Sequence, residues 1–227
     1  MRKILIIGGS KGIGRATLNR MIENNQIINI SRVSPNSDHE NLTHHSCDVL
    51  VDVLPEIDEV DALMYCPGSI NLKPISRLKL DDFRDDFEVN VIGAVRVIQR
   101  YLPQLKKGKS PSIVLFSTVA SKMGMPFHAS VAAAKSAVEG LMKSLGAELA
   151  PTIRVNAIAP TVTDTELASK LLRNERMTEN IIERHPLKKY LDPTEVAEMA
   201  QFLLSEKSLS LSGQVFEMDC GIVSFKI

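Results

Sequence analysis

The chain has 227 residues, of which 44% are hydrophobic and 24% are charged, a balance typical of a globular protein with a full apolar core. Lys and Arg together number 27, as do Asp and Glu, which gives a formal net charge of zero. Nucleic-acid binding and polybasic membrane anchoring depend on clustered positive charge, so the composition argues against both. A small anionic ligand held by backbone amides and one or two basic side chains is compatible with it.

The sequence predicts no targeting or membrane-spanning segment. The apolar run at residues 4–7 ends at Gly8, so it is too short for the hydrophobic region of a signal peptide and favours a buried strand. No stretch approaches the roughly 18 consecutive apolar residues that cross a bilayer. The three cysteines (Cys47, Cys66 and Cys220) are widely spaced, which predicts neither a metal site nor a disulfide framework, and indicates a cytoplasmic location.

Short apolar runs alternate along the chain with amphipathic segments. Strands are predicted at residues 3–7, 27–30, 62–65, 112–116, 154–157 and 214–218, and helices at residues 13–24, 80–105, 129–149 and 193–205. Strands separated by helices form parallel sheets, and right-handed crossovers place helices on both faces. The sequence therefore predicts an α/β fold, a single doubly wound Rossmann-type domain over residues 1–227.

Two loops and one short connection interrupt this alternation. The polar stretch 34–45 is a predicted loop, and so is the stretch after Pro160, which leads into a charged, partly helical segment at about 165–186 that we interpret as a lid. Only about 13 residues separate Asp48 from Asp61, which is too few for a full crossover helix. A very short helix or an irregular crossing is expected there.

A glycine-rich turn at residues 8–14 (Gly, Gly, Ser, Lys, Gly, Ile, Gly) follows the first predicted strand and opens a helix. Glycines here allow a tight turn, a close approach of the backbone to a pyrophosphate, and close packing of the helix on the strand. The helix amino terminus adds unpaired N–H groups and a partial positive charge. This position favours a dinucleotide site over a merely tight strand-to-helix connection.

The spacing of these glycines resembles that of the short-chain dehydrogenase/reductase family, and the resemblance extends over essentially the whole chain. Residues 66–68 (Cys, Pro, Gly) stand where the family usually has Asn-Ala-Gly beside the cofactor, and Asn90 matches its helix asparagine. Asp48 stands where the family contacts the adenine. Residues 154–160 resemble the strand that ends at the nicotinamide, and residues 212–214 and 219–221 resemble the carboxyl-terminal signature.

The charge pattern predicts NADP(H) rather than NAD(H). Rossmann sites that choose NAD place Asp or Glu at the ribose 2′-hydroxyl, but the second predicted strand ends in Ser31 and Arg32. Both would suit a 2′-phosphate, with Lys11 as a second cation, although Arg32 and Lys11 could also be solvated surface charges. The candidate cofactor-binding residues are Gly8, Ser10, Lys11, Gly12, Ile13, Gly14, Ser31, Arg32, Asp48, Val49, Cys66, Pro67, Gly68, Asn90, Lys135, Pro160, Val162 and Thr163.

The catalytic motif departs from the family pattern. Members normally carry Tyr-x-x-x-Lys on the long central helix, where the tyrosine gives a proton to the substrate oxygen and the lysine holds the ribose. Lys135 matches the lysine, but Val131 stands four residues earlier and has no proton to give. The assisting serine of the family corresponds to Thr118, which Ser117 precedes. The resemblance therefore implies catalytic roles for Asn90, Thr118 and Lys135 and leaves the acid unassigned.

His128, seven residues before Lys135, is the candidate acid. At about 100° per residue it would sit above Val131, provided that the helix reaches that far. Enoyl-thioester reductases of the same superfamily carry their tyrosine at this spacing, and histidine is an effective general acid near neutral pH. A surface histidine in a loop is the alternative. Tyr65 is more readily explained as a core residue, and Tyr190 could reach the site only from a loop.

The leading hypothesis is an NADPH-dependent oxidoreductase that delivers hydride to a small carbonyl or enoyl substrate. Asn90 would hold a water relay, Thr118 would orient the substrate oxygen, Lys135 would bind the nicotinamide ribose, and His128 would donate the proton. Because the tyrosine is missing, a dinucleotide-binding sensor or assembly subunit without redox turnover is the alternative. By resemblance, the long helices around Asn90 and Lys135 pair between subunits, which implies a homodimer or homotetramer.

Overall fold

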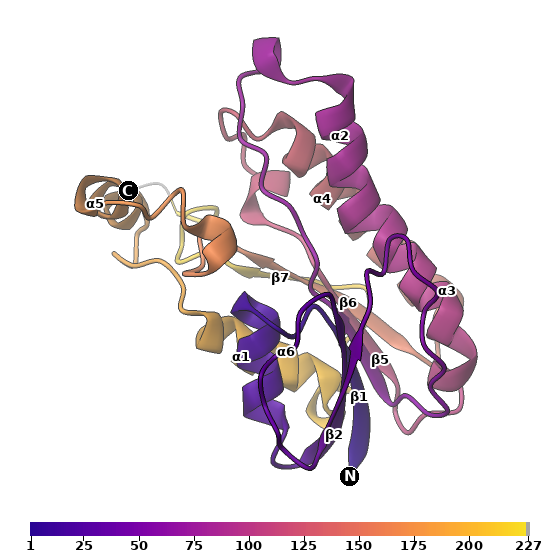
Figure 1. Cartoon of the computed structure of the whole chain (residues 1–227). Helices are drawn as coiled ribbons and strands as arrows, with labels where there is room; N and C mark the ends of the chain where they lie inside the picture. Colours follow the sequence, from indigo (N-terminus) through magenta and orange to yellow (C-terminus); the bar gives the residue numbers. More distant parts are fainter. Residues whose placement is uncertain (226–227) are drawn as a thin grey trace.

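The computed structural model describes residues 1–225, and its centre is one parallel sheet of seven strands (Figure 1). The strands are β1 (Arg2–Ile7), β2 (Asn25–Ser31), β3 (Leu42–Ser46), β4 (Ala62–Tyr65), β5 (Ser112–Phe116), β6 (Arg154–Pro160) and β7 (Val215–Met218). Their order is β3-β2-β1-β4-β5-β6-β7, so the chain builds outward in one direction from β1 and in the other from β4. This order confirms the predicted doubly wound, Rossmann-type fold.

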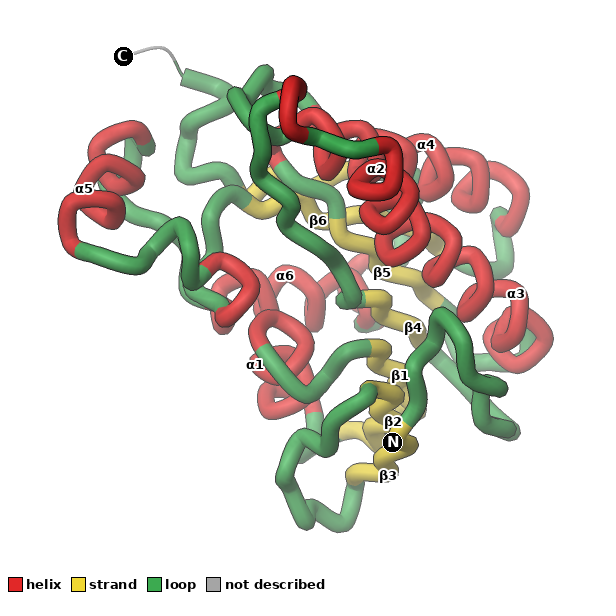
Figure 2. The backbone as a smooth tube through the Cα atoms, turned by 45° about the horizontal axis from the view of Figure 1, so that its top comes forward, coloured by secondary structure: helices red, strands yellow, loops and turns green. Residues whose placement is uncertain are grey.

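Helices cover both faces of the sheet, as Figure 2 shows. The first face carries α1 (Gly12–Met21) and α6 (Pro193–Leu204), and the second carries α2 (Leu80–Phe87), α3 (Gly93–Leu105) and α4 (Ala129–Leu149). In β1, Leu5 and Ile7 belong to the core beneath α3 and α4, whereas Ile4 and Ile6 belong to the core beneath α1 and α6. A continuous apolar run is what a strand buried on both faces requires. Among the described residues, no helix is long and apolar enough to cross a membrane.

The strand β3 lies where the sequence predicted a loop. The prediction for residues 34–45 was wrong from Leu42 onward, because Leu42–Ser46 pairs in parallel with β2. Its sequence is Leu-Thr-His-His-Ser, and it forms one edge of the sheet. An edge strand with one aliphatic side chain lacks the apolar pattern that identifies buried strands, so it is held by backbone pairing that the sequence does not reveal.

Two connections on the second face differ from regular crossovers. The predicted helix 80–105 is interrupted, because α2 ends at Phe87, a π-helical turn follows at Glu88–Ile92, and α3 begins at Gly93. Such turns are frequent at functional sites, and this one contains Asn90. Between β3 and β4 the chain forms turns and bends without a described helix, so the expected irregular crossing is confirmed.

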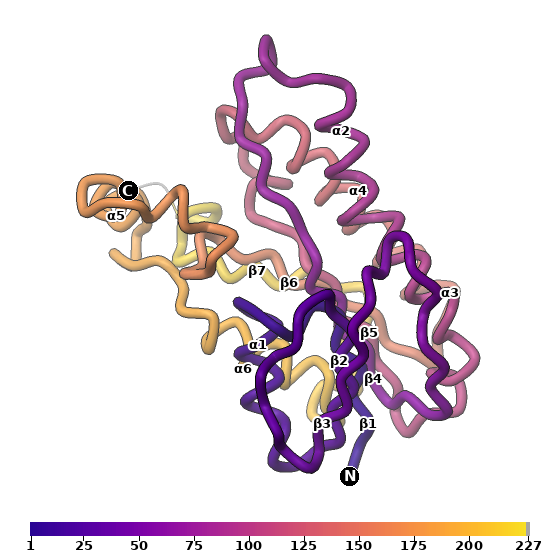
Figure 3. Tube along the Cα trace, viewed as in Figure 1, coloured from indigo at the N-terminus to yellow at the C-terminus, as the bar shows by residue number. Residues whose placement is uncertain are grey.

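The predicted lid contains a short 3₁₀ turn (Glu166–Ala168) and α5 (Glu175–Arg184). Figure 3 shows this segment leaving the sheet and lying beside the carboxyl-terminal residues. The buried side chain of His185 anchors it, with Nδ1 2.6 Å from the Ile181 carbonyl and Nε2 2.7 Å from the Thr161 hydroxyl. The lid is therefore tied at its base to the residues that follow β6.

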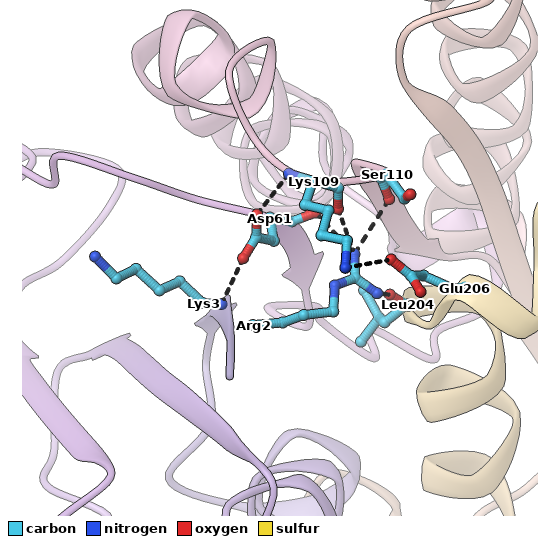
Figure 4. Close-up of polar contacts among 7 residues, drawn as sticks. All are labelled: Arg2, Lys3, Asp61, Lys109, Ser110, Leu204 and Glu206. Carbon is cyan, nitrogen blue, oxygen red and sulfur yellow. Dashed lines mark hydrogen bonds and ion pairs between the residues drawn. The ribbon is translucent and has the colours of Figure 1, made fainter.

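At the amino ends of the strands, opposite the glycine turn, side chains connect neighbouring parts of the sheet by hydrogen bonds (Figure 4). Asp61 accepts hydrogen bonds from the backbone N–H groups of Lys3 (2.8 Å) and Lys109 (2.6 Å). Arg2 donates to the carbonyl oxygens of Leu204 (2.6 Å) and Ser110 (3.1 Å). These contacts join β1 to the loops before β4 and β5 and to the end of α6, so the polar groups at the amino ends of these strands bond to one another.

Candidate active site

A cavity of about 500 Å³ lies at the carboxyl ends of the strands, where ligands bind in doubly wound sheets. The loops after β1, β4, β5 and β6 and the start of the lid form its walls. The predicted cofactor residues that line it are Gly8, Lys11, Gly12, Ile13, Gly14, Cys66, Pro67, Gly68, Lys135, Pro160, Val162 and Thr163. Residues that line it without having been predicted include Ser69, Thr161 and Leu167.

The glycine turn has the backbone that its sequence predicts. Gly8 and Gly12 have positive φ angles of 82° and 51°, a conformation that side chains other than glycine rarely adopt. A side chain on Gly14 would collide with the carbonyl oxygen of Gly8, so its absence lets α1 begin directly against the turn. The first turn of α1 contains no acidic residue, which leaves its N–H groups and dipole available to an anion.

The buried side chain of Asn29, in β2, holds the turn in place. Its Oδ1 accepts a hydrogen bond from the Gly9 N–H (2.8 Å), and its Nδ2 donates to the Ser31 hydroxyl (2.9 Å) and approaches His44 Nδ1 (3.0 Å). The sequence analysis missed Asn29. A fully buried polar residue between two isoleucines, Ile28 and Ile30, is the signal that could have indicated it.

Lys135 brings a positive charge to the floor of the cavity. Its side chain extends from α4, is 8% exposed, and donates a hydrogen bond from Nζ to the Phe116 carbonyl at 2.9 Å. Burial disfavours the ammonium form and lowers the Lys135 pKa to about 8, despite the opposing charges of Cys66 and Asp86. A lysine with this pKa is a cation near neutral pH and can bind hydroxyl oxygens. It loses its proton when the pH rises above about 8.

Asn90 and Lys135 face a common gap beside Gly68. A Cβ atom on Gly68 would lie 3.3 Å from Asn90 Oδ1 and 3.4 Å from Lys135 Nζ, so the glycine leaves this space open. The Asn90 amide nitrogen donates inward to the Asp86 carbonyl (2.6 Å), which turns Oδ1 toward the gap. Oδ1 is buried and has no partner among the described residues, so it is an acceptor available to a ligand.

Thr118 lines the cavity at the end of β5, in the position predicted for the residue that orients the substrate. Its hydroxyl oxygen caps the short turn that follows by accepting from the Ala120 N–H at 3.4 Å. The neighbouring Ser117 hydroxyl instead donates to Glu139 Oε1 at 2.6 Å, and Ser121 donates to the same oxygen at 2.5 Å. Glu139 on α4 therefore fixes the loop that presents Thr118.

Comparisons with known proteins agree with this geometry. Residues 43–223 match the family model described as enoyl-(acyl carrier protein) reductase. The 3-oxoacyl-(acyl carrier protein) reductase FabG of Thermotoga maritima is 34% identical over 177 residues, which are 78% of this chain and 71% of the relative. The chain belongs to the short-chain dehydrogenase/reductase family. Carbonyl reductase (NADPH) 2 of Sus scrofa is 27% identical over 98% of this chain and 96% of its own. The structure of ElxO with NADP bound has a TM-score of 0.88, with 25% identity over 99% of each chain.

Within this family the chain is unusual at Val131, which is 5% exposed and lines the cavity. His128 lines the same cavity and is the N-cap of α4, which begins at Ala129, and its carbonyl oxygen accepts a hydrogen bond from the Ala132 N–H at 2.8 Å. The imidazole is oriented by its Nδ1, which donates to the Pro126 carbonyl at 2.8 Å. Only Nε2 can then carry a transferable proton, and only when the ring is protonated.

The tyrosines of the chain do not replace the missing one. Tyr65 is a core residue, as expected, and donates a hydrogen bond from its hydroxyl to the Val89 carbonyl at 2.7 Å. Burial raises the Tyr65 pKa. The Tyr101 hydroxyl is bonded to the Pro55 carbonyl at 2.9 Å, and Tyr190 is not part of the cavity lining.

The residues predicted to contact the far end of the cofactor lie outside this cavity. Ser31, Arg32, Asp48 and Val49 are at the ends of β2 and β3 and do not line it. The Ser31 hydroxyl donates to the Val33 carbonyl at 2.8 Å, so it would have to give up this internal bond to donate to a phosphate. The Arg32 side chain is 78% exposed, with its guanidinium 3.9 Å from the Asp48 carboxylate.

The lowered pKa of Lys135 predicts a change of stability with pH. Below pH 8 the ammonium is charged in both states, whereas from about 8 to its ordinary value of 10.5 only the unfolded state keeps the proton. Because the unfolded state then binds more protons, the free energy of unfolding gains a contribution that rises with pH. We expect the free energy of unfolding of the wild type, measured by urea titration and compared with that of Lys135→Met, to rise by about 1–3 kcal/mol between pH 8 and pH 10.5. The exposed Lys143 on the same helix, changed to Met, is the matched control; an equal rise in both comparisons would contradict the assignment.

Proposed function

We propose that the protein is an NADPH-dependent oxidoreductase that transfers hydride to a small carbonyl or enoyl substrate. The observation that carries this proposal is the gap beside Gly68. The buried Lys135 ammonium and Asn90 Oδ1, which has no partner among the described residues, both face this gap. Gly68 lines the same cavity as the glycine turn. Family membership supports an oxidoreductase, and the names of the relatives support carbonyl or acyl substrates.

The residues present fit a dinucleotide. The turn at Gly8, Gly12 and Gly14 has no side chain to obstruct a pyrophosphate, and the start of α1 supplies donors for it. Lys135 would hold ribose hydroxyls, because two of its three N–H bonds remain after the bond to Phe116. The loop after β6, with Val162 and Thr163, would form the wall beside the nicotinamide.

A bound NADPH supplies the hydride, and the protein positions and protonates the substrate. Thr118 orients the oxygen that becomes basic, and His128 donates a proton to it from Nε2. Val131, Met125 and Leu167 contribute apolar wall that excludes water from the reacting atoms. A second cavity, of about 430 Å³, shares Met125 and His128 and includes Phe127, which supports a substrate with an apolar extension.

The preference for NADPH over NADH rests on charge. Lys11 is exposed at the glycine turn, and Arg32 is exposed after β2, at the site where NAD-selective relatives of the fold place a carboxylate. The Sus scrofa relative is named for NADPH, and ElxO has been solved with NADP. Since Ser31 is committed to an internal bond, we assign the 2′-phosphate to these two cations alone.

Replacing Arg32 by Ala should weaken NADPH binding and leave NADH binding nearly unchanged. Loss of one exposed charge-assisted contact should raise the NADPH Kd by about 10-fold, as measured by isothermal titration calorimetry. Arg20→Ala, which removes a surface charge beside α6, is the control. A parallel loss for both dinucleotides, or none for either, would contradict the charge argument.

Purified protein should oxidise NADPH when it is offered a panel of carbonyl and enoyl-thioester compounds. Replacing His128 by Ala should then lower kcat by about 10²–10⁴-fold, the usual range for a lost general acid. An unchanged kcat would eliminate His128 as the donor. Dinucleotide binding without turnover of any compound would favour the alternative function, a sensor or assembly subunit, which the buried Val131 motivates.

We further propose that the protein works as a homodimer or homotetramer in the cytoplasm. Leu80, Phe87 and Ile92 are 73%, 42% and 41% exposed along α2 and the turn after it, beside α4. The three cysteines, all within the described residues, are unpaired, which supports a reducing compartment. Light scattering should give two or four times 25.0 kDa, and Phe87→Arg should lower that mass. A wild-type mass of one chain would overturn the assembly.

A further inference from the structure

Tyr65, the last residue of β4, places its hydroxyl group against the π-helical turn that contains Asn90. The side chain is 3% exposed, and the hydroxyl donates a hydrogen bond to the Val89 carbonyl at 2.7 Å. Burial raises the Tyr65 pKa, so the hydroxyl keeps its proton and remains a donor. The proposed reaction does not use this group, and a phenylalanine ring would fill the same apolar space. The hydroxyl therefore requires a separate explanation.

The π-helical turn creates the need for this donor. In an α-helix, the Gly93 N–H would donate to the Val89 carbonyl, four residues earlier. Here the Gly93 N–H donates instead to the Glu88 carbonyl, five residues earlier. The Val89 carbonyl has thus lost its α-helical donor, and the Tyr65 hydroxyl replaces it. Because only the π-helical form needs this replacement, the hydroxyl stabilises that form relative to a regular α-helix.

Gly93 leaves room for the Tyr65 hydroxyl. A Cβ atom on Gly93 would collide with the hydroxyl oxygen and would lie 2.7 Å from Leu50 Cδ2. Gly93 is buried and has a φ angle of −59°, so its backbone conformation does not require glycine. Glycine is otherwise unfavourable in a helix, so the space taken by the hydroxyl accounts for its presence here. Tyr65 and Gly93 therefore form one arrangement that holds the turn.

The chain just after Tyr65 holds the Asn90 side chain. Asn90 Nδ2 donates to the Ser69 hydroxyl oxygen at 3.1 Å and to the Asp86 carbonyl at 2.6 Å. The Ser69 hydroxyl in turn lies 2.5 Å from Asp86 Oδ1. These bonds leave Asn90 Oδ1 facing the gap beside Gly68. A change of one residue in helical register rotates a side chain by about 100°, so loss of the π-helical form would turn Oδ1 away from the gap.

We propose that Tyr65 is a positioning residue of the active site: its hydroxyl keeps the turn π-helical, and the turn in this form directs Asn90 Oδ1 into the gap beside Gly68. This inference rests on the proposed function, in which the groups that face the gap act on the dinucleotide and the substrate. Tyr65 does not line the cavity, so it acts only through the Val89 carbonyl and Asn90.

Hydrogen–deuterium exchange of the ligand-free protein tests the hold on the turn. Tyr65→Phe keeps the ring and removes the hydroxyl, so the amide hydrogens of residues 90–94 should exchange about 5–10-fold faster. Tyr101→Phe is the matched control, because Tyr101 is fully buried and its hydroxyl donates to the Pro55 carbonyl at 2.9 Å. The control should lower the melting temperature by a similar amount and leave exchange at residues 90–94 within about 2-fold. Equal exchange in Tyr65→Phe and wild type overturns the inference.

Turnover tests whether the hydroxyl acts through Asn90. With NADPH and the panel compound that the wild type reduces fastest, Tyr65→Phe should lower kcat by about 10–100-fold at nearly unchanged KM, because a small misplacement has this effect. Tyr101→Phe should keep kcat within about 2-fold. When Asn90→Ala has already removed the amide, adding Tyr65→Phe should lower kcat by less than about 2-fold. An additive loss, which general support of the fold would produce, contradicts the inference.

A second variant covers the case in which Tyr65→Phe does not fold, as judged by circular dichroism. Gly93→Ala displaces the hydroxyl without removing it and should give the same faster exchange and lower kcat. Wild-type values in Gly93→Ala would then overturn the inference and leave the proposed function standing. If the wild type oxidises NADPH with none of the compounds, the proposed function is overturned, whereas the exchange measurement still decides whether the Tyr65 hydroxyl holds the turn.

Discussion

The candidate site at the carboxyl ends of the strands depends on the buried ammonium group of Lys135. It reaches the Phe116 carbonyl, and its remaining N–H bonds face the space that Gly68 leaves open. A buried ammonium group without a counter-ion is unfavourable, and it becomes favourable when oxygen atoms of a ligand bind it. This property is typical of a binding site rather than of a structural ion pair. The π-helical turn contains Asn90, whose Oδ1 faces the same gap, and Gly68 keeps the gap free of a side chain.

Val131 stands where the family resemblance implies a tyrosine, and its buried side chain lines the cavity. Lys135 and Thr118, which the family resemblance predicted, line one cavity, and Asn90 Oδ1 faces the gap beside Gly68 at its wall. Valine fills the position of the acid with an apolar, buried side chain. The proposed function therefore depends on proton delivery from a group other than residue 131, beside a buried ammonium that has no salt-bridge partner among the described residues.

The sequence predicted the features that are local in the chain. The glycine turn and the apolar strands follow from residue type and spacing, because each is determined by its own segment, whereas Lys135 follows from the family resemblance. The strand β3 was missed because backbone pairing at an edge leaves no apolar pattern. His128 was predicted in line with Lys135 on the condition that the helix reaches it, and the structure makes His128 the N-cap of α4. Asn29, Ser69 and Asp86 were missed because their roles come from contacts between segments far apart in sequence, such as Ser69 with Asp86.

The cluster of Ser69, Asp86 and Asn90 is difficult to explain by stability. Buried polar groups with unpartnered atoms weaken a fold, and apolar residues of similar size would pack between α2 and the cavity wall at lower cost. The opposite edge of the sheet shows the alternative, because there Asp61 accepts hydrogen bonds from two backbone N–H groups and so joins separate strands. Asp86 accepts one hydrogen bond, from the Ser69 hydroxyl, and its Oδ2 has no partner among the described residues. These polar groups lie next to the residues that the proposed function assigns to the cofactor, and their hydrogen bonds link the loop after β4 to α2 and to the turn that contains Asn90.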